Sequence, residues 1–380
     1  MSRAAQCQRR RRRLAAGLAS ALLLAACSED PAPSGAFGTA GLESLPPNRW
    51  VSLHEARDLG WHRQGHAGAA YDRRRGHLLL FGSDTHGRDW DNTVHRFDPA
   101  TRRWQRSHPP ADPDSYRADG SERAVAGPRG DQPWAMHTYD GVLYDALADA
   151  LFVASHPLHN PRRQEVSAEL APFAWRHGLE TGEWRALPAP TSLFLSASAY
   201  DERRETIVVY SNGIWELGPE RSQWLQASAE SHHNMHHTMA YDSRSGSLAV
   251  FGDQRSERAR EGVWLYHPGT LPGDAGRWEY RRPGGDECPA DQHFPAAYSP
   301  DHGVYLLLPD EGGEDAERAV TCVYDPERNR YRRLPEATLP AQGMNFMMVY
   351  DRRREVFLLV TGSHAEPTTV WALRLERSAS

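Results

Sequence analysis

The chain has 380 residues with 44 basic and 50 acidic side chains, which gives a formal net charge of −6 at pH 7. Hydrophobic residues account for 39% of it, and 31 glycines and 27 prolines interrupt them, which favours short strands joined by turns over long helices. The acidic balance argues against the basic surface that nucleic-acid binding requires, so we expect no nucleic-acid partner.

Residues 1–26 have the form of an export signal, in which a run of arginines precedes an apolar stretch that is short for a membrane span. The stretch ends in Leu-Ala-Ala-Cys at residues 24–27, which resembles the lipobox of bacterial lipoproteins. That resemblance implies cleavage before Cys27, a lipid anchor on Cys27 and, since Ser28 follows rather than aspartate, sorting to the outer membrane. An ordinary secretory signal and an uncleaved N-terminal anchor are the alternatives.

Residues 27–47 are rich in proline, glycine, serine and alanine, and we expect them to form a flexible tether. Residues 48–380 carry six repeats and are expected to form a single domain. Each repeat contains a tyrosine-aspartate tag, with serine in place of aspartate in the fifth. The tag tyrosines are Tyr71, Tyr144, Tyr200, Tyr241, Tyr298 and Tyr350.

Each tag is followed by a short apolar run, then by a further run after a variable loop, and in five repeats by a segment with an aromatic residue. The sixth repeat lacks the aromatic segment, whereas "NRWVSL" around Trp50 has the same form and precedes the first repeat. We therefore expect the N-terminal strand to complete the last repeat. Four short strands per repeat predict an all-β fold, a six-bladed β-propeller, with seven blades as the alternative.

The pattern resembles kelch-type propellers, the fold of the central domain of galactose oxidase, most closely over residues 65–104. It departs from that family at Gly82-Ser83, where kelch repeats have two glycines, and later repeats depart further. The loops at 111–130 and 157–170 are predicted insertions.

The residue five positions before each tag tyrosine is predicted to face the central channel, because the first strand of a propeller blade lines it. These residues are His66, Tyr139, Leu195, His236, His293 and Asn345. In the second blade the sequence looks locally expanded, so His137 is the alternative to Tyr139. His237 should point away from the channel, into a blade interface, because adjacent residues of a strand face opposite sides.

Loops at the same end of the blades carry further polar side chains, so we expect ionisable groups to converge on one mouth of the channel. These loop residues include His86, His156, His159, Arg162, Arg163 and His233. A strand cannot present four histidines to one ion, and the predicted ring positions are spread around the axis, so we assign no metal ligands. No cofactor is required by the sequence, and the presence of a divalent metal is left open.

Three functions are compatible with this arrangement. The first is a monomeric, lipid-anchored binding module that holds a glycan or a protein on its loop face. Its candidate ligand-binding residues are His66, His156, His233, His293, Asn345 and Trp134. Fold alone does not decide between binding and catalysis.

The second function is a polysaccharide lyase that acts on a uronate-containing glycan, with His137, Tyr139 and His236 as acid and base. The placement of His137 and His156 around one hairpin is similar to that in propeller lyases of the ulvan type. The third is copper-radical oxidation as in galactose oxidase, which the positions of Cys288 and Cys322 disfavour. These two cysteines are either disulfide-bonded or free buried thiols.

Overall fold

The computed structural model describes residues 41–56, 65–87, 89–166, 169–233, 236–252, 262–289, 294–312, 316–341, 343, 347–363 and 366–376. The predicted signal peptide, Cys27, His293 and Asn345 lie outside these residues. Within them, no helix is long and apolar enough to cross a membrane.

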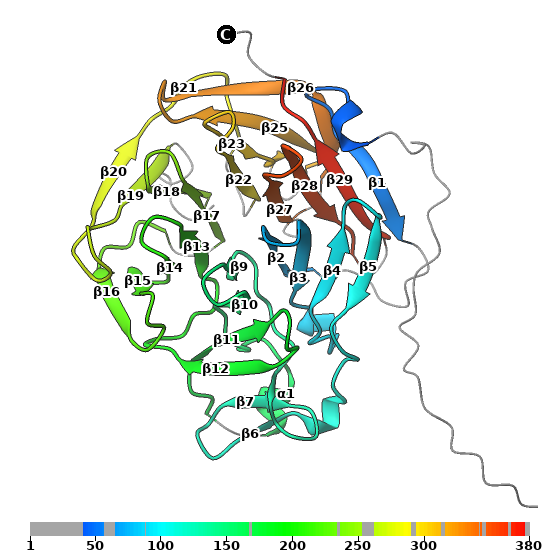
Figure 1. Cartoon of the computed structure of the whole chain (residues 1–380), viewed down its shortest axis with the longest axis vertical. Helices are drawn as coiled ribbons and strands as arrows, with labels where there is room; N and C mark the ends of the chain where they lie inside the picture. The colour runs from blue at the N-terminus through cyan, green and yellow to red at the C-terminus, as the bar shows by residue number, and fades with distance from the viewer. Residues whose placement is uncertain are drawn as a thin grey trace, which may run out of the picture.

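Six antiparallel sheets stand around a central axis as the blades of a propeller (Figure 1). Their innermost strands contact one another in a closed cycle, in the order β2, β9, β13, β17, β22, β27 and back to β2. The first two blades consist of β2 (Gly68–Asp72), β3 (His77–Phe81), β4 (His95–Asp98) and β5 (Arg103–Arg106), and of β9 (Val142–Asp145), β10 (Ala150–Val153), β11 (Phe173–Gly178) and β12 (Trp184–Pro188). The predicted six-bladed fold is confirmed.

The third and fourth blades repeat this order. They consist of β13 (Ala197–Asp201), β14 (Thr206–Tyr210), β15 (Ile214–Leu217) and β16 (Trp224–Ser228), and of β17 (His237–Asp242), β18 (Ser247–Gly252), β19 (Val263–His267) and β20 (Arg277–Arg281). The second strands are buried along almost their whole length, because each is packed between two neighbouring sheets.

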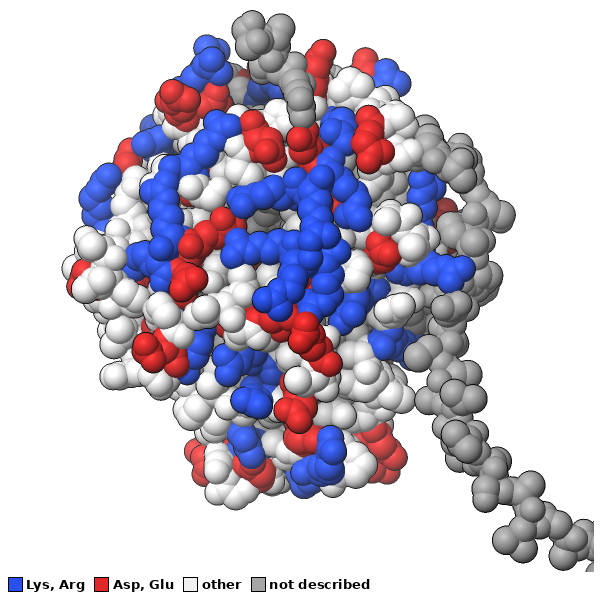
Figure 2. Space-filling view, in the orientation of Figure 1, with Lys and Arg blue, Asp and Glu red and all other residues white. Residues whose placement is uncertain are grey.

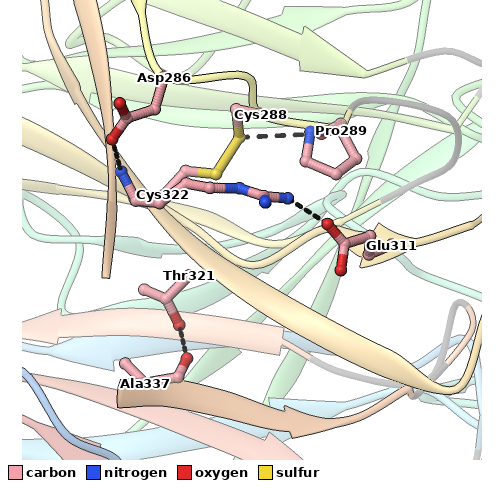
Figure 3. The surroundings of a disulfide bond; sticks show 8 residues. Asp286, Cys288, Pro289, Glu311, Thr321, Cys322 and Ala337 are labelled. Carbon is pink, nitrogen blue, oxygen red and sulfur yellow. Dashed lines mark hydrogen bonds and ion pairs between the residues drawn. A yellow bond between two sulfur atoms is a disulfide. The ribbon is translucent and has the colours of Figure 1, made fainter. Parts of the chain in front are cut away.

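The fifth blade is the most elaborate. It contains β22 (Ala296–Ser299), β23 (Val304–Leu307), β25 (Arg318–Asp325) and β26 (Arg330–Pro340), with β21 (Gly284–Gly285) and β24 (Asp310–Glu311) added at its edges. A disulfide joins Cys288 to Cys322 of β25, with the Cα atoms 6.2 Å apart, which settles the alternative left open by the sequence (Figure 3). This bond and a hydrogen bond from Arg333 N to Asp286 hold the segment after β21 against the blade.

The sixth blade is closed by the N-terminal strand, as predicted. It consists of β27 (Met347–Asp351), β28 (Val356–Thr361), β29 (Thr368–Leu373) and β1 (Val51–Ala56), and β1 pairs antiparallel with β29 (Figure 1). Part of the predicted tether also packs here, in contrast to our expectation. Leu42, in the short helix η1 (Leu42–Ser44), and Leu45 are 7% and 8% exposed, because both are apolar and reach the core of this blade.

The tyrosine-aspartate tags form the hairpins between the first and second strands. In the first blade the Asp72 carboxylate accepts hydrogen bonds from the backbone N–H groups of Arg74 and Arg75, both at 3.0 Å, which fixes the turn. Equivalent bonds are made by Asp201, Asp242 and Asp351. All six tag tyrosines line one pocket of about 240 Å³ at this end of the channel.

Arginines of these hairpins connect one blade to the next. Arg353 donates to the carbonyl oxygen of Arg75, and Arg244 donates to those of Pro300 and Asp301. The face drawn in Figure 2 accordingly carries many basic side chains near its centre. Because the guanidinium groups of Arg353 and Arg244 are engaged with backbone, we interpret this patch as part of the ring closure.

The two predicted insertions pack together beside the second blade (Figure 1). They contain η3 (Pro113–Ser115), β6 (Arg117–Ala118), β7 (Ala124–Ala126) and α1 (Arg162–Glu165). β8 (Gln132–Pro133), directly after the first insertion, completes a small sheet with β6 and β7. The remaining short helix, η2 (Thr85–Gly87), lies between β3 and β4.

Candidate functional site

The residues that enter the inner strands share an unusual backbone conformation. His66, Tyr139, Leu195 and His236 have φ angles of 66°, 45°, 59° and 58°, the left-handed region that non-glycine residues seldom adopt. This common geometry shows that the four positions are equivalent in their blades. Tyr139 therefore holds the repeat position of the second blade, and His137 lies two residues before it.

Histidine side chains converge at this end of the channel, opposite the tyrosine-aspartate hairpins. The rings of His66 and His137 are 4.4 Å apart between centroids, and that of His86 is 4.7 Å from His137. His159, in the loop after β10, places its ring 5.0 Å from His86 and 5.5 Å from His137. We call His66, His86, His137, His159 and Tyr139 the histidine mouth.

The spacing of three of these imidazoles differs from what we expected. One ring nitrogen from each of His66, His86 and His137 lies within 4.8 Å of the other two, a separation at which a single metal ion could contact all three. The reason is that two of the three come from one blade, His66 before β2 and His86 in η2. The six predicted ring positions, by contrast, come from six different blades.

Backbone hydrogen bonds hold the first two blades in place at the mouth. The carbonyl oxygen of His66 accepts from the N–H groups of Thr138 and Tyr139, both at 2.9 Å. The Thr138 hydroxyl accepts from Gly68 N at 2.7 Å and donates to the carbonyl oxygen of Phe81 at 2.7 Å. These bonds fix the backbone of both segments through the His66 carbonyl oxygen and the Thr138 hydroxyl.

A glycine allows this close approach between blades. Gly82, which follows β3, has a φ angle of 121°, and a Cβ atom there would collide with the Thr138 hydroxyl. Substitution at Gly82 is therefore expected to displace the His137 segment.

His137 is the most buried member of the mouth, at 2% exposure. Its Nε2 atom has no hydrogen-bond partner and lies 3.9 Å from Asp84 Oδ1, while its Nδ1 atom is 3.5 Å from the Tyr139 hydroxyl. Burial, with smaller contributions from His66, His86 and His159, lowers the pKa of His137 to about 2. The imidazole is therefore neutral, with a free lone pair available to a ligand or a metal.

Tyr139 connects this cluster to the fourth blade. Its ring is 5.0 Å from that of His66 and 5.7 Å from that of His236. Burial, and next the charge of Asp84, raises the pKa of the Tyr139 phenol, so the hydroxyl keeps its proton. Next to it, Asp140 accepts a hydrogen bond from Met239 N, in β17 of the fourth blade, at 2.7 Å.

A pocket of about 630 Å³ adjoins the mouth. It is lined by His86, His159, Arg163, other residues of the loop before and within α1, and the exposed Glu169 after α1. Phe194, half-buried in the loop before β13, places its ring 4.7 Å from His159 and adds an apolar surface beside the imidazoles. Asp84 and Phe194 were not predicted from the sequence, because neither stands at a repeat position or in a recognisable motif.

Several predicted ligand-binding residues lie elsewhere. Trp134 is completely buried in the core of the insertions, where its indole N–H donates to the carbonyl oxygen of Val125 at 3.0 Å, so it cannot contact a ligand. His233 is 5% exposed and has its Nδ1 atom 3.2 Å from the Tyr210 hydroxyl, between the third and fourth blades. Both were assigned to the mouth because sequence does not show which loop residues fold inward.

His237 packs against the same tyrosine, with ring centroids 4.8 Å apart, and is 5% exposed. It faces a blade interface, as expected from its position next to His236. Of the histidine-rich stretch, only His236 among the described residues lies beside the mouth through its contact with Tyr139.

His156 is 5% exposed and, among the described residues, makes no ring contact with the histidine mouth. Burial, with a smaller effect of Arg163, lowers its pKa to about 4. Because the unfolded chain takes up a proton below a pKa of about 6.5, whereas the native state does so only near pH 4, the native state becomes less stable as the pH falls through this range.

We expect a His156→Gln variant to lose less stability than the wild type when the pH is lowered from about 7.5 to about 5, by about 2 kcal/mol. Urea unfolding at the two pH values measures the difference. Parallel losses in the two proteins would show that His156 is protonated in the native state.

The comparisons with known proteins leave the family open. No model of a known protein family matches the chain, and no curated protein sequence matches it. The fold and the site by themselves define the class of the protein, which is a six-bladed β-propeller with a histidine-lined channel mouth.

Proposed function

We propose that this protein is a lipid-anchored, extracytoplasmic propeller of kelch type that binds an acidic glycan at the histidine mouth. The observation that carries the proposal is the pocket next to the mouth, which brings Arg163 together with His86 and His159. Among the described residues no ion pair joins the Arg163 guanidinium to a carboxylate, although Glu169 lines the same pocket. An arginine in this state is suited to bind a carboxylate in two-pronged geometry.

The shape and composition of the pocket support a sugar rather than a protein as the ligand. A volume of about 630 Å³ suits a few monosaccharide units. Histidines and an amide provide hydrogen-bond donors and acceptors for hydroxyl groups, and Phe194 provides a flat apolar surface for sugar C–H groups.

Titration with uronate oligosaccharides, compared with neutral oligosaccharides of equal length, tests this function. We expect binding of the uronate series only, and a loss of at least about tenfold in affinity in Arg163→Ala, because one charge-assisted contact is removed. Arg129→Ala is the control, since Arg129 pairs with Asp131 on the surface of the insertion. Equal affinity for neutral sugars, or an unchanged Arg163→Ala variant, would contradict the proposal.

A lyase is the second candidate, favoured by the distance of 3.5 Å between the Tyr139 hydroxyl and His137 Nδ1. In such a reaction a base removes the proton α to the uronate carboxylate, a double bond forms, and the departing glycosidic oxygen takes a proton from an acid. The protonated phenol of Tyr139 suits the acid, whereas His137, with a pKa of about 2, is a weak base. An unsaturated product that appears with the wild type but not with Tyr139→Phe would establish it.

The lipid anchor on Cys27 and the outer-membrane location remain proposals that rest on the sequence at residues 24–28. A Cys27→Ser variant should fail to incorporate labelled fatty acid and should leave the membrane fraction. Retention of this variant in carbonate-washed membranes would rule the anchor out.

A further inference from the structure

We propose that His66, His86 and His137 form a binding site for a divalent transition metal, of which Zn²⁺ fits the ligand set best. Three points within 4.8 Å of one another have a common centre less than about 3 Å from each, close to the zinc–nitrogen distance of about 2.0–2.1 Å. Small side-chain rotations would complete the coordination. The site shares His86 with the pocket proposed for the glycan, but the metal proposal does not rest on glycan binding.

The buried nitrogen of His137 is a second, separate observation that points to a ligand. Nε2 of this fully buried ring has no hydrogen-bond partner, and leaving a buried polar atom unsatisfied is costly. A metal on Nε2 would satisfy it. The other nitrogen, Nδ1, then carries the proton and points towards the Tyr139 hydroxyl, the type of outer partner that orients histidine ligands.

The scaffold also suits a metal. The segments that carry His66 and His137 are joined by the hydrogen bonds from Thr138 and Tyr139 to the His66 carbonyl oxygen. Two of the three ligands are thus held at a fixed separation before the metal binds, which reduces the ordering that binding requires.

The ligand set indicates which metal and which kind of site. Three imidazoles without a thiolate favour zinc and its neighbours in the first transition row over calcium or magnesium, which prefer oxygen ligands. The described residues that could complete the coordination are Asp84, whose Oδ1 is 3.9 Å from His137 Nε2, and His159. Because His86 is exposed and lines the pocket, the remaining position would be open to water or to a ligand carboxylate.

The proposal excludes one of the mechanisms considered above. With Nε2 bound to a metal and Nδ1 protonated, His137 has no lone pair left for proton abstraction. A metal at this site and a lyase that uses His137 as its base are therefore mutually exclusive. Acidic-glycan binding is compatible with the metal.

Calorimetric titration of the EDTA-treated full chain with Zn²⁺ tests the site, with the metal content measured after dialysis. We expect one tightly bound zinc per chain, and at least a 100-fold weaker dissociation constant in His86→Ala. His86 is exposed, so this variant should fold normally. His108→Ala is the matched control, since His108 lies outside the mouth, beside Trp184. X-ray absorption should show imidazole nitrogens at about 2.0–2.1 Å.

His137→Gln should have the same effect as His86→Ala, and its thermal unfolding without metal shows whether it folds. Tight zinc binding that survives in His86→Ala, or a wild type that binds no zinc after EDTA treatment, would overturn the proposal. Neither result bears on uronate binding, which is measured without added metal.

Discussion

Removal of strand β1 is expected to abolish stable folding of the propeller. The strand supplies the outer edge of the sixth blade, where Val51, Leu53 and Ala56 are 8%, 4% and 6% exposed. Burial of a valine or leucine side chain contributes about 1.5–3 kcal/mol, and the edge of β29 would lose its hydrogen-bond partner. The sum is comparable to the whole stability of a typical domain.

A point substitution allows the same effect to be measured in a folded protein. Leu53→Ala should lower the free energy of unfolding by about 3–5 kcal/mol, because a cavity replaces a buried side chain. Ser52→Ala, on the exposed face of the same strand, should change it by less than about 0.5 kcal/mol. Equal values for the two variants would show that the ring does not depend on this strand.

Substitution of Arg221 by methionine should lower the free energy of unfolding by about 3–5 kcal/mol. Arg221 forms a two-pronged ion pair with Asp145, with nitrogen–oxygen distances of 2.7 and 2.9 Å. The two side chains are 6% and 0% exposed. Removing the arginine would leave a buried carboxylate unpaired.

This pair replaces an interaction that other blades make internally. Asp72, Asp201 and Asp351 each pair with an arginine of their own hairpin, whereas the second-blade tag contains no arginine and Asp145 is paired from the third blade. Arg221→Met combined with Asp145→Leu should therefore be more stable than Arg221→Met alone.

Glu336→Gln, which breaks the exposed ion pair with Arg49, is the control and should cost less than about 1 kcal/mol. Chemical denaturation of the four proteins gives the comparison. A double variant no more stable than Arg221→Met would contradict the assignment of the loss to an unpaired Asp145.

The fold could be predicted because its signals are local and repeated. The tyrosine-aspartate tag specifies a turn through its own aspartate, as at Asp72, and it recurs in each blade with little change. The position of β1 followed from one missing aromatic segment at the end and one extra at the start. Leu42 and Leu45 were missed because composition suggested a tether, whereas two apolar side chains were enough to attach the segment to the blade.

The site could be predicted only in part, because it depends on how loops fold. Counting back five residues from each tag tyrosine predicted that His66, Tyr139 and His236 lie at one end of the channel. Their shared left-handed backbone conformation agrees with this prediction. It gave no information on the direction of loop side chains. Trp134 therefore turned out to be a core residue, and the approach of His86 to His66 was not foreseen.

We propose that the histidines of the mouth bind a ligand, whereas those at the blade interfaces stabilise the fold. Uronate affinity and melting temperature, measured side by side for His159→Ala and His237→Ala, test it most directly. His159 is exposed beside the pocket, so its variant should bind at least about tenfold more weakly and melt like the wild type. His237 is buried against Tyr210, so its variant should melt at a lower temperature and retain its affinity. Loss of stability without loss of affinity in both variants would contradict the claim.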